Sequence, residues 1–424
     1  MRIALPSGTR ALRGGVTVFC LTMFWFAGPA QAVKRRAFVT SIAGSGNIST
    51  WPGATGATAL DRADSVCRAL AAAADTPLPN ASTYRAWLST STTDAYCHVQ
   101  GLTGKKATGC GGGALPGGGP WFLANGITNF TGDLDELVDE GVIYRPVQRD
   151  ENFDPIPTTL AERSYWTGTL VDGTADAQNC GNWLSTSGNG RIGEAWATVG
   201  RWTESIGPDC SASRRLLCLE PGAGERTTLH WSPGAIVFVT SEIGSGAMND
   251  WPESDGINGL AGADRICRNV ALAGHLPVPD SFVAWLSTAA VDASARLTTN
   301  GPFRRIDAFT IANNLSDLTD GTIATTIHVQ EDGTYLLDNN GTWTGTLGDG
   351  TFHPDRCLDW TSMVGSDDGL TGLETYAGLD DWTDNFIANC SDVYRLYCFS
   401  NIITIFWDGF EITGDASRWS NIQP

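Results

Sequence analysis

Residues 262–288 read GADRICRNVALAGHLPVPDSFVAWLST and contain one cysteine, Cys267, followed by a tryptophan in an apolar run. Small or apolar side chains recur here at the spacing of one helix face, i, i+3, i+4 and i+7, at Ala263, Ile266, Cys267, Val270 and Gly274. The spacing predicts a helix that lies on a core and turns Cys267 inward. A buried cysteine is either a free thiol that packs as a small apolar side chain or half of a disulfide. The stretch alone leaves both alternatives open.

The first 32 residues have the pattern of a secretory signal peptide. Arginines precede an apolar run, and the run closes with the small-residue motif Ala30-Gln31-Ala32, so we expect cleavage before Val33. Cys20 lies inside the apolar run and would leave with the signal. No later apolar run reaches the roughly 20 residues that a membrane-spanning helix needs. We therefore expect an exported protein without an integral membrane segment, located outside the cell, at its surface or in the periplasm.

The cysteine count and the net charge indicate disulfide bonds and exclude some classes of binding partner. Of the 11 cysteines, ten remain without Cys20, an even number in a chain expected to reach a compartment where disulfides persist. This favours a disulfide for Cys267. The formal charge of the chain is −19. Such an acidic chain is a poor partner for nucleic acid, polyanionic polysaccharides or anionic lipid, because these are bound through Lys and Arg.

The opening stretch belongs to a long internal repeat. Residues 38–67 and 238–267 align without a gap and are identical at 14 of 30 positions. The match continues through RAWLST and VAWLST, through WTGTLVDGT and WTGTLGDGT, and through the closing CSASRRLLC and CSDVYRLYC. A repeat of this length indicates a duplicated domain rather than a solenoid.

The repeat sets the domain boundaries. We expect a signal peptide at 1–32, a first unit at 36–221, a linker at 222–234, a second unit at 235–400 and a C-terminal tail at 401–424. Each unit should begin with a strand, pass through a Gly/Ser/Trp-Pro loop into the cysteine-bearing helix, and continue with the Ala-Trp-Leu-Ser segment as a second strand. It should close with short strands separated by turn residues. This is a loop-rich α+β pattern with one or two helices per unit.

The cysteines follow the repeat. The second unit has four, at Cys267, Cys357, Cys390 and Cys398, and the first unit has their counterparts at Cys67, Cys180, Cys210 and Cys218. Four cysteines allow three pairings, and spacing alone does not choose among them. Cys97 and Cys110 have no counterparts in the second unit, so their simplest fate is to pair with each other. Zinc would require closely spaced cysteines or nearby histidines, and the histidines do not recur at equivalent positions; we expect no metal.

The order of these motifs resembles a known family. GADRIC, AWLST, WTGT, DGT and the closing YRLYC are similar to the endostatin-like branch of the C-type-lectin-like fold, and more closely to a bacterial secreted domain family of unknown function related to it. The resemblance covers both units and implies two tandem C-type-lectin-like domains. It also implies that the first cysteine pairs with the last and the second with the third, as Cys67–Cys218, Cys180–Cys210, Cys267–Cys398 and Cys357–Cys390. Cys267 would then tie its helix to the final strand.

The resemblance does not carry a function across. Calcium-dependent C-type lectins use a Glu-Pro-Asn or Gln-Pro-Asp triplet and a Trp-Asn-Asp triplet, and neither occurs here. Calcium needs several oxygen ligands at one point, but the acidic segments 131–140 and 365–372 differ between the units and are expected to be solvated loops. We expect no cofactor. A calcium-dependent carbohydrate-binding lectin remains the alternative, and binding that a chelator abolishes would support it.

Catalysis is the other alternative. A nucleophilic enzyme needs a Ser or Cys near a His, and an acid–base enzyme needs paired carboxylates in a shared setting. The five histidines suggest no such arrangement, and the expected disulfides leave no free thiol. We therefore expect a non-catalytic binding or adhesion protein whose ligand is an extracellular glycan or protein, with an enzyme on the same fold as the less favoured alternative.

The middle segments of the two units differ most, and loops on a rigid scaffold are where binding diverges. The first unit carries Trp121 and Phe122 between glycines and apolar neighbours, and an exposed aromatic pair is a typical contact surface. We predict that binding resides in segment 97–131, involves Trp121 and Phe122, and is insensitive to chelator. Trp202 and Trp382 occupy matching positions in the two units, which favours core packing over a sugar platform. The tail resembles short C-terminal tails of exported bacterial proteins and is either a loosely ordered end or a sorting signal.

Overall fold

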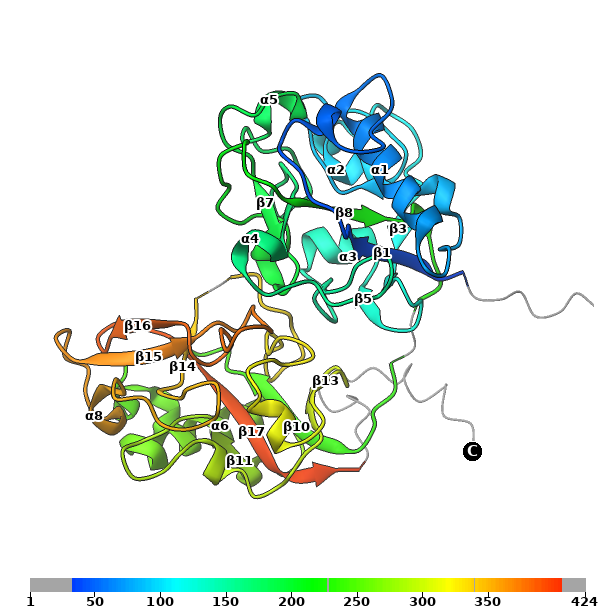
Figure 1. Ribbon diagram of the computed structural model, residues 1–424. Coiled ribbons are helices and arrows are strands. Elements are labelled where there is room, and N and C mark those ends of the chain that lie inside the picture. Colours follow the sequence, from blue (N-terminus) through cyan, green and yellow to red (C-terminus); the bar gives the residue numbers. More distant parts are fainter. Residues whose placement is uncertain (1–32, 227–228, 339, 406–424) are drawn as a thin grey trace, which may run out of the picture. The chain divides into compact units, whose positions relative to one another are not determined.

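The computed structural model describes residues 33–226, 229–338 and 340–405. The expected signal peptide, with Cys20, and tail residues 406–424 lie outside the described residues. The chain from Val33 onward forms one compact unit, and it combines short helices with mixed sheets, so the expected α+β class is confirmed. Figure 1 shows one large sheet in residues 33–226, the first half, and another in residues 229–405, the second half.

The first half contains strands β1 to β9 and helices α1 to α5. The strands are β1 (Arg35–Val39), β2 (Arg85–Ala86), β3 (Gly118–Gly119), β4 (Trp121–Leu123), β5 (Asn129–Thr131), β6 (Ser164–Trp166), β7 (Ile192–Glu194), β8 (Arg215–Leu219) and β9 (Gly222–Ala223). The helices are α1 (Ala59–Ala73), α2 (Ala95–Val99), α3 (Leu134–Asp139), α4 (Leu160–Arg163) and α5 (Cys180–Trp183).

The second half repeats this order with fewer elements. Its strands are β10 (Gly234–Val239), β11 (Phe282–Ala284), β12 (Phe303–Arg305), β13 (Thr310–Ala312), β14 (Thr342–Trp343), β15 (Asp368–Gly372), β16 (Phe386–Asn389) and β17 (Arg395–Thr404). Its helices are α6 (Gly259–Ala273), α7 (Leu315–Leu318) and α8 (Cys357–Trp360).

The strands of the two large sheets follow the same order, and the second sheet has one more strand at its end. The first sheet runs β5-β4-β1-β8-β6-β7 and the second runs β13-β12-β10-β17-β14-β15-β16. In each, the first strand pairs antiparallel with the last, which places Phe38 opposite Cys218 and Phe238 opposite Cys398. β2 pairs with the end of β8, at Cys218 and Leu219, and β11 pairs with the middle of β17, from Cys398 to Ser400. The chain therefore closes each half by bringing its beginning and its end together at the centre of a sheet.

The long helix of each half forms where the spacing predicts it. Thr58 caps α1 by accepting the backbone N–H of Asp61, whose side chain accepts the N–H of Thr58 in return, an arrangement that satisfies two donors at a helix start. In α6, the buried face includes Ala263, Ile266 and Cys267. The predicted inward direction of Cys267 is thus confirmed.

Five disulfides join the ten described cysteines. The long bridges are Cys67–Cys218 and Cys267–Cys398, which attach α1 to β8 and α6 to β17; the shorter ones are Cys180–Cys210, Cys357–Cys390 and Cys97–Cys110. This is the nested pairing that the family resemblance implies. Each long bridge closes a loop of more than a hundred residues, which removes much of the chain entropy of the unfolded state.

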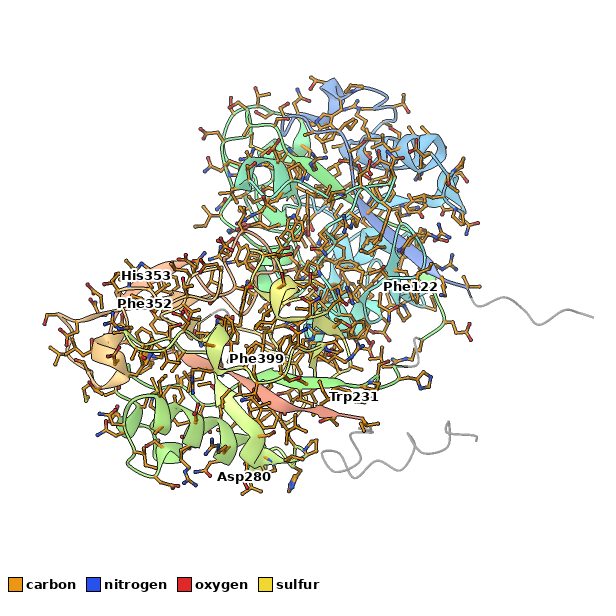
Figure 2. All side chains as sticks on the ribbon, turned by 60° about the horizontal axis from the view of Figure 1, so that its bottom comes forward. Phe122, Trp231, Asp280, Phe352, His353 and Phe399 are labelled. Atoms are coloured by element: carbon orange, nitrogen blue, oxygen red, sulfur yellow. A yellow bond between two sulfur atoms is a disulfide. The ribbon has the colours of Figure 1, made fainter. Side chains whose placement is uncertain are left out.

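Tryptophans dominate the core of both halves, although the strands beside them are shorter than expected. β2 and β11 end one residue before Trp87 and Trp285, so the Ala-Trp-Leu-Ser segment is a strand only at its beginning. Both indoles are fully buried, and they donate to Thr203 Oγ1 at 2.8 Å and Thr383 Oγ1 at 2.9 Å. Phe399 of β17 lies inside the second half, as Figure 2 shows, and its ring contacts that of Trp285.

The two halves contact each other within the compact unit. Tyr376 donates to Glu194 Oε2 at 2.8 Å, and the backbone N–H of Thr198 donates to Thr375 O at 2.8 Å. One cluster of buried apolar side chains includes residues of both halves, among them Trp196 and Ala377. Among the described helices, none is long and apolar enough to cross a membrane.

Candidate functional site

The structure places the two predicted ligand-binding aromatics in the core. Trp121 is fully buried and Phe122 is 4% exposed. Both belong to β4, which pairs with β1 on one side and β5 on the other, and the indole N–H of Trp121 donates to Glu220 O at 2.9 Å. The expectation that this pair forms an exposed contact surface is wrong, because the surrounding glycine-rich segment contributes strands to the sheet.

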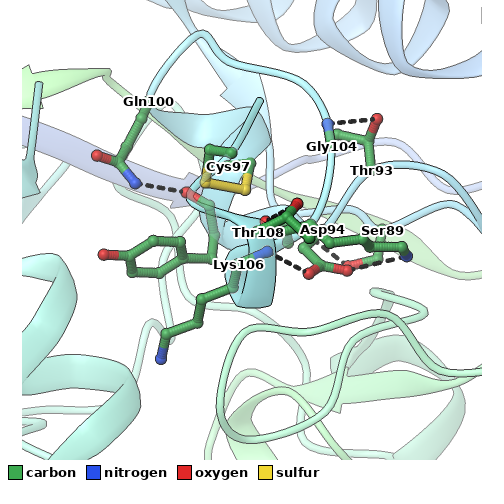
Figure 3. Close-up of a disulfide and its surroundings, with 12 residues drawn as sticks. Ser89, Thr93, Asp94, Cys97, Gln100, Gly104, Lys106 and Thr108 are labelled. Atoms are coloured by element: carbon green, nitrogen blue, oxygen red, sulfur yellow. Dashed lines mark hydrogen bonds and ion pairs between the residues drawn. A yellow bond between two sulfur atoms is a disulfide. The ribbon is translucent and has the colours of Figure 1, made fainter. Parts of the chain in front are cut away.

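The segment before these residues, 97–119, is longer than its counterpart in the second half; this segment, here called the insert, forms part of a cavity. Cys97–Cys110 anchors the insert to α2, as Figure 3 shows. Asp94, nearly buried, accepts the backbone N–H of Lys106 at 2.7 Å and forms an ion pair with Lys105 at 3.0 Å. Gln100 donates to Tyr96 O at 2.9 Å and accepts the N–H of Gly117 at 3.0 Å. These bonds hold both ends of the insert against α2.

The cavity lies between this insert, α3 and β9 and has a volume of about 310 Å³. Its walls combine an aromatic ring, an exposed leucine, a glycine-rich backbone and charged side chains. Its lining includes Tyr96, Gln100, Leu115, Gly117, Asp135 and Arg226. The volume is at the lower end of what small-molecule sites show, so the cavity suits one small ring rather than a long ligand.

The polar groups of the cavity are held in fixed positions. Tyr96 donates its hydroxyl to Asp135 Oδ1 at 2.7 Å. Burial, with this hydrogen bond adding to it, raises the pKa of Tyr96 above its ordinary value, so the hydroxyl keeps its proton. Arg226 donates to Asp133 and Glu136, at 2.8 Å in both cases. The fixed donors and acceptors match a ligand rich in hydroxyl groups.

The charge around the cavity limits the ligand further. Asp133, Asp135 and Glu136 stand near one another on and before α3, and Arg226 is the cation among the lining residues. Because Arg226 is already paired with two carboxylates, it is not a free anion receptor. An anionic ligand is therefore disfavoured.

The second half carries different residues at the equivalent positions. Counted from the shared Ala-Trp-Leu-Ser motif and from the N-caps Asp133 and Asn314, Tyr96 corresponds to Ser294, Gln100 to Thr298 and Asp135 to Ser316. The sheet pair β3–β9 that lines the cavity joins Gly118 to Gly222 in the first half. The cavity is therefore a feature of the first half, in the region where the sequence predicts binding.

The other candidate residues have structural partners. Trp202 and Trp382 are buried beside Trp87 and Trp285, in agreement with core packing. His98 is buried and contacts Asp64 Oδ1 at 2.9 Å, and Asp64 also pairs with Arg68 and Arg85. In the part of the chain that the structure describes, no group of three or more His, Cys, Asp or Glu is arranged to hold a metal ion.

The acidic segments divide into helix and loop. In 131–140, Asp133 and Glu136 form the capping box of α3, and this segment contributes to the cavity rather than being only a solvated loop. Segment 365–372 forms the end of the loop before β15 and the whole of that strand. A scan against protein-family models finds no match to the chain, and a search of curated proteins finds none either.

Sequence analysis missed the cavity residues Tyr96, Asp135 and Arg226. One signal was present, because Tyr96 directly precedes the extra cysteine Cys97, and an extra disulfide marks an insert held in a defined conformation. No local pattern marks Arg226, which comes from the linker and reaches α3 only through the fold.

Proposed function

We propose that this protein is an exported, non-catalytic binding or adhesion protein made of two C-type-lectin-like domains, and that the cavity of the first half binds a neutral, hydroxylated ligand such as a terminal sugar of a surface glycan. The observation that carries the proposal is the cavity itself, with Tyr96 and Asp135 fixed at its wall. Hydroxyl groups of a sugar would meet carboxylate, amide and backbone groups, and its apolar face would meet Leu115 and Pro120.

Several features support the scaffold and the compartment. The repeated helix, the nested disulfides and the shared tryptophans agree with the order of motifs in the resembling family. Five disulfides are typical of proteins in oxidising compartments. Together they favour an extracellular, cell-surface or periplasmic protein.

Non-catalytic binding is favoured by the side chains around the cavity. Among the described residues that line it, none is a Ser, Thr, Cys or His, and the phenol of Tyr96 is held in its protonated form by burial and by Asp135. A nucleophile with an adjacent base is not among these groups, and the two lining carboxylates are already engaged, Asp133 by Arg226 and Asp135 by Tyr96, so the cavity is suited to binding rather than to catalysis.

The test is NMR-detected binding of a panel of neutral methyl glycosides to the full chain. We expect binding by the wild type, loss of about tenfold or more in Asp135→Asn and Tyr96→Phe, and no change in Ser316→Ala, which alters the position equivalent to Asp135 in the second half. Binding should be unchanged by chelator. Binding that EDTA abolishes, or that survives both first-half substitutions in a folded protein, would overturn the proposal.

A further inference from the structure

A second surface stands out when the two halves are compared position by position. It surrounds Cys357–Cys390 and consists of residues 242–243, 358–368 and 391–393, named here the disulfide loops. The equivalent loops of the first half surround Cys180–Cys210 and consist of 42–43, 181–189 and 211–213. The loop after the first cysteine is two residues longer in the second half, where Gly365 and Ser366 have no counterpart, and the other positions correspond.

Shared backbone contacts establish the correspondence. Gly244 pairs with Tyr394 as Gly44 pairs with Arg214. The N–H of the last cysteine of the pair donates to Asp367 O in the second half and to Gly188 O in the first, at 2.8 Å in both. The loops therefore have the same frame, and differences in their side chains are not explained by differences in fold.

The disulfide loops of the second half expose large apolar side chains. Leu358 is 66% exposed, and four others are exposed by about half: Ile243, Met363, Val364 and Val393. The first half has Gly181 where Leu358 stands, and small or polar residues at the other four positions, which are Ala43, Thr186, Ser187 and Ser213. It exposes Leu184 and Ile206 near its own bridge. Exposed apolar side chains concentrated on one loop cluster are typical of protein interaction sites.

Leu358 is exposed at a conformational cost. Its φ is 51° and ψ 54°, in the left-handed region, where a side chain with a Cβ is disfavoured. The first half adopts the same conformation with glycine, Gly181, at φ 61° and ψ 46°. A leucine that is both strained and solvent-exposed contributes nothing to the core, so its presence is better explained by a contact outside the fold.

The same loops also gain negative charge. The second half carries Glu242, Asp359, Asp367, Asp368 and Asp392, and at these five positions the first half has Ile42, Asn182, Gly188, Asn189 and Ala212. Arg356 forms an ion pair with one of these carboxylates, that of Asp359. The second half thus has a carboxylate at five positions where the first half has none, and large apolar side chains at five others where the first half has small or polar residues.

We infer that the disulfide loops of the second half are a docking surface for a protein segment that carries apolar side chains together with Lys or Arg. Apolar contacts would cover Leu358, Met363, Val364 and Val393, and the basic side chains would meet the surrounding carboxylates. A second copy of this chain does not fit, because a symmetric contact would oppose the carboxylates to themselves. An anionic membrane is disfavoured for the same electrostatic reason.

The test uses the full chain and three synthetic peptides of equal length, which alternate Leu with Lys, Leu with Glu, and Ser with Lys. We expect the Leu/Lys peptide to bind, more weakly at high salt, and the other two to bind at least about tenfold more weakly. Equal binding of the Leu/Glu peptide would contradict the charge argument. Equal binding of the Ser/Lys peptide would contradict the apolar one.

Variants in which residues of the disulfide loops are replaced by their first-half counterparts test whether the peptide binds at this surface. Met363→Thr with Val364→Ser and Val393→Ser should weaken Leu/Lys binding about tenfold. Asp368→Asn with Asp392→Ala should remove much of its salt dependence. Ser187→Ala with Ser213→Ala, the matched control in the first half, should change nothing. Unchanged affinity in the apolar variant would overturn the inference, and so would self-association of the wild type that this variant abolishes, because the surface would then bind a second copy.

Discussion

The two halves of this protein share a frame and differ in what they present on it. Both attach a long helix to the last strand through a disulfide, and both bury a tryptophan whose indole donates to a threonine. The first half then adds an insert, held by Cys97–Cys110, that forms a small polar cavity. The second half adds exposed apolar and acidic side chains around Cys357–Cys390. A stable duplicated frame thus leaves its loops free to present two different surfaces, a cavity in one half and an apolar, acidic loop cluster in the other.

The largest expected effect tests whether the frames are equivalent. Cys67→Ala with Cys218→Ala, and separately Cys267→Ala with Cys398→Ala, should each lower the free energy of unfolding by about 4 kcal/mol, because the closed loops are of similar length. Chemical denaturation of each variant beside the wild type measures this. A difference of more than about 2 kcal/mol between the two would show that the bridges do not have equivalent roles.

A second comparison concerns the aspartate at the same position within each long helix, Asp64 of α1 and Asp264 of α6. Asp64 is almost fully buried and contacts Arg68, Arg85 and His98, as well as the backbone N–H of Ala86. Asp264 is more exposed; it accepts the equivalent backbone N–H, that of Ala284, and among the described residues it pairs with Arg296 alone. We expect Asp64→Ala to cost about 3 kcal/mol, because it leaves buried partners unpaired, and Asp264→Ala about half of that. Urea denaturation measures both, and a larger cost at Asp264 would contradict this account.

The positions of the disulfides and tryptophans could be predicted from the sequence because they recur in both units. The helix face of Cys267 and the pairing implied by the resemblance agree with the structure. The exposure of Trp121 and Phe122 could not be predicted, because the strands that bury them are short and lie among glycines. The cavity combines residues from α2, the insert, α3 and the linker, and only the fold brings Arg226 to Asp133 and Glu136.

The halves should also differ in their response to pH. Glu374 is fully buried in the second half, and this burial raises its pKa to about 7. Its carboxylate accepts the backbone N–H groups of Asn340 and Gly341, and the hydrogen bonds lower the pKa by less than burial raises it. The equivalent residue of the first half is Ala195. Because the folded-state pKa lies above the unfolded one, the stabilisation is complete below the unfolded pKa and is lost as pH rises through about 7.

The free energy of unfolding, measured over a range of pH in the wild type and in Glu374→Gln, tests this difference. The wild type should lose about 3 kcal/mol more than the variant between acidic and mildly alkaline pH. Parallel curves for the two proteins would show that Glu374 does not titrate in this range.

The smallest expected effect concerns backbone strain in the disulfide loops. Leu358→Gly should raise the free energy of unfolding by up to about 1 kcal/mol, since glycine adopts φ 51° without strain. The reverse substitution, Gly181→Leu, should lower it by about the same amount. Thermal unfolding of both variants beside the wild type measures the two changes in stability. If Leu358→Gly destabilised the protein, the leucine would be a structural residue, and its exposure would no longer point to a partner.

Hydrogen–deuterium exchange of the full chain tests the central claim most directly, because it reads both halves in one experiment. With a saturating methyl glycoside that binds, we predict slower exchange in residues 96–135 and no change in 294–316. With the Leu/Lys peptide, we predict slower exchange in 356–368 and 390–394 and no change in 180–190 and 210–214. Protection of equivalent segments in both halves by the same ligand would contradict the account, since the duplicated domains would then share one binding surface.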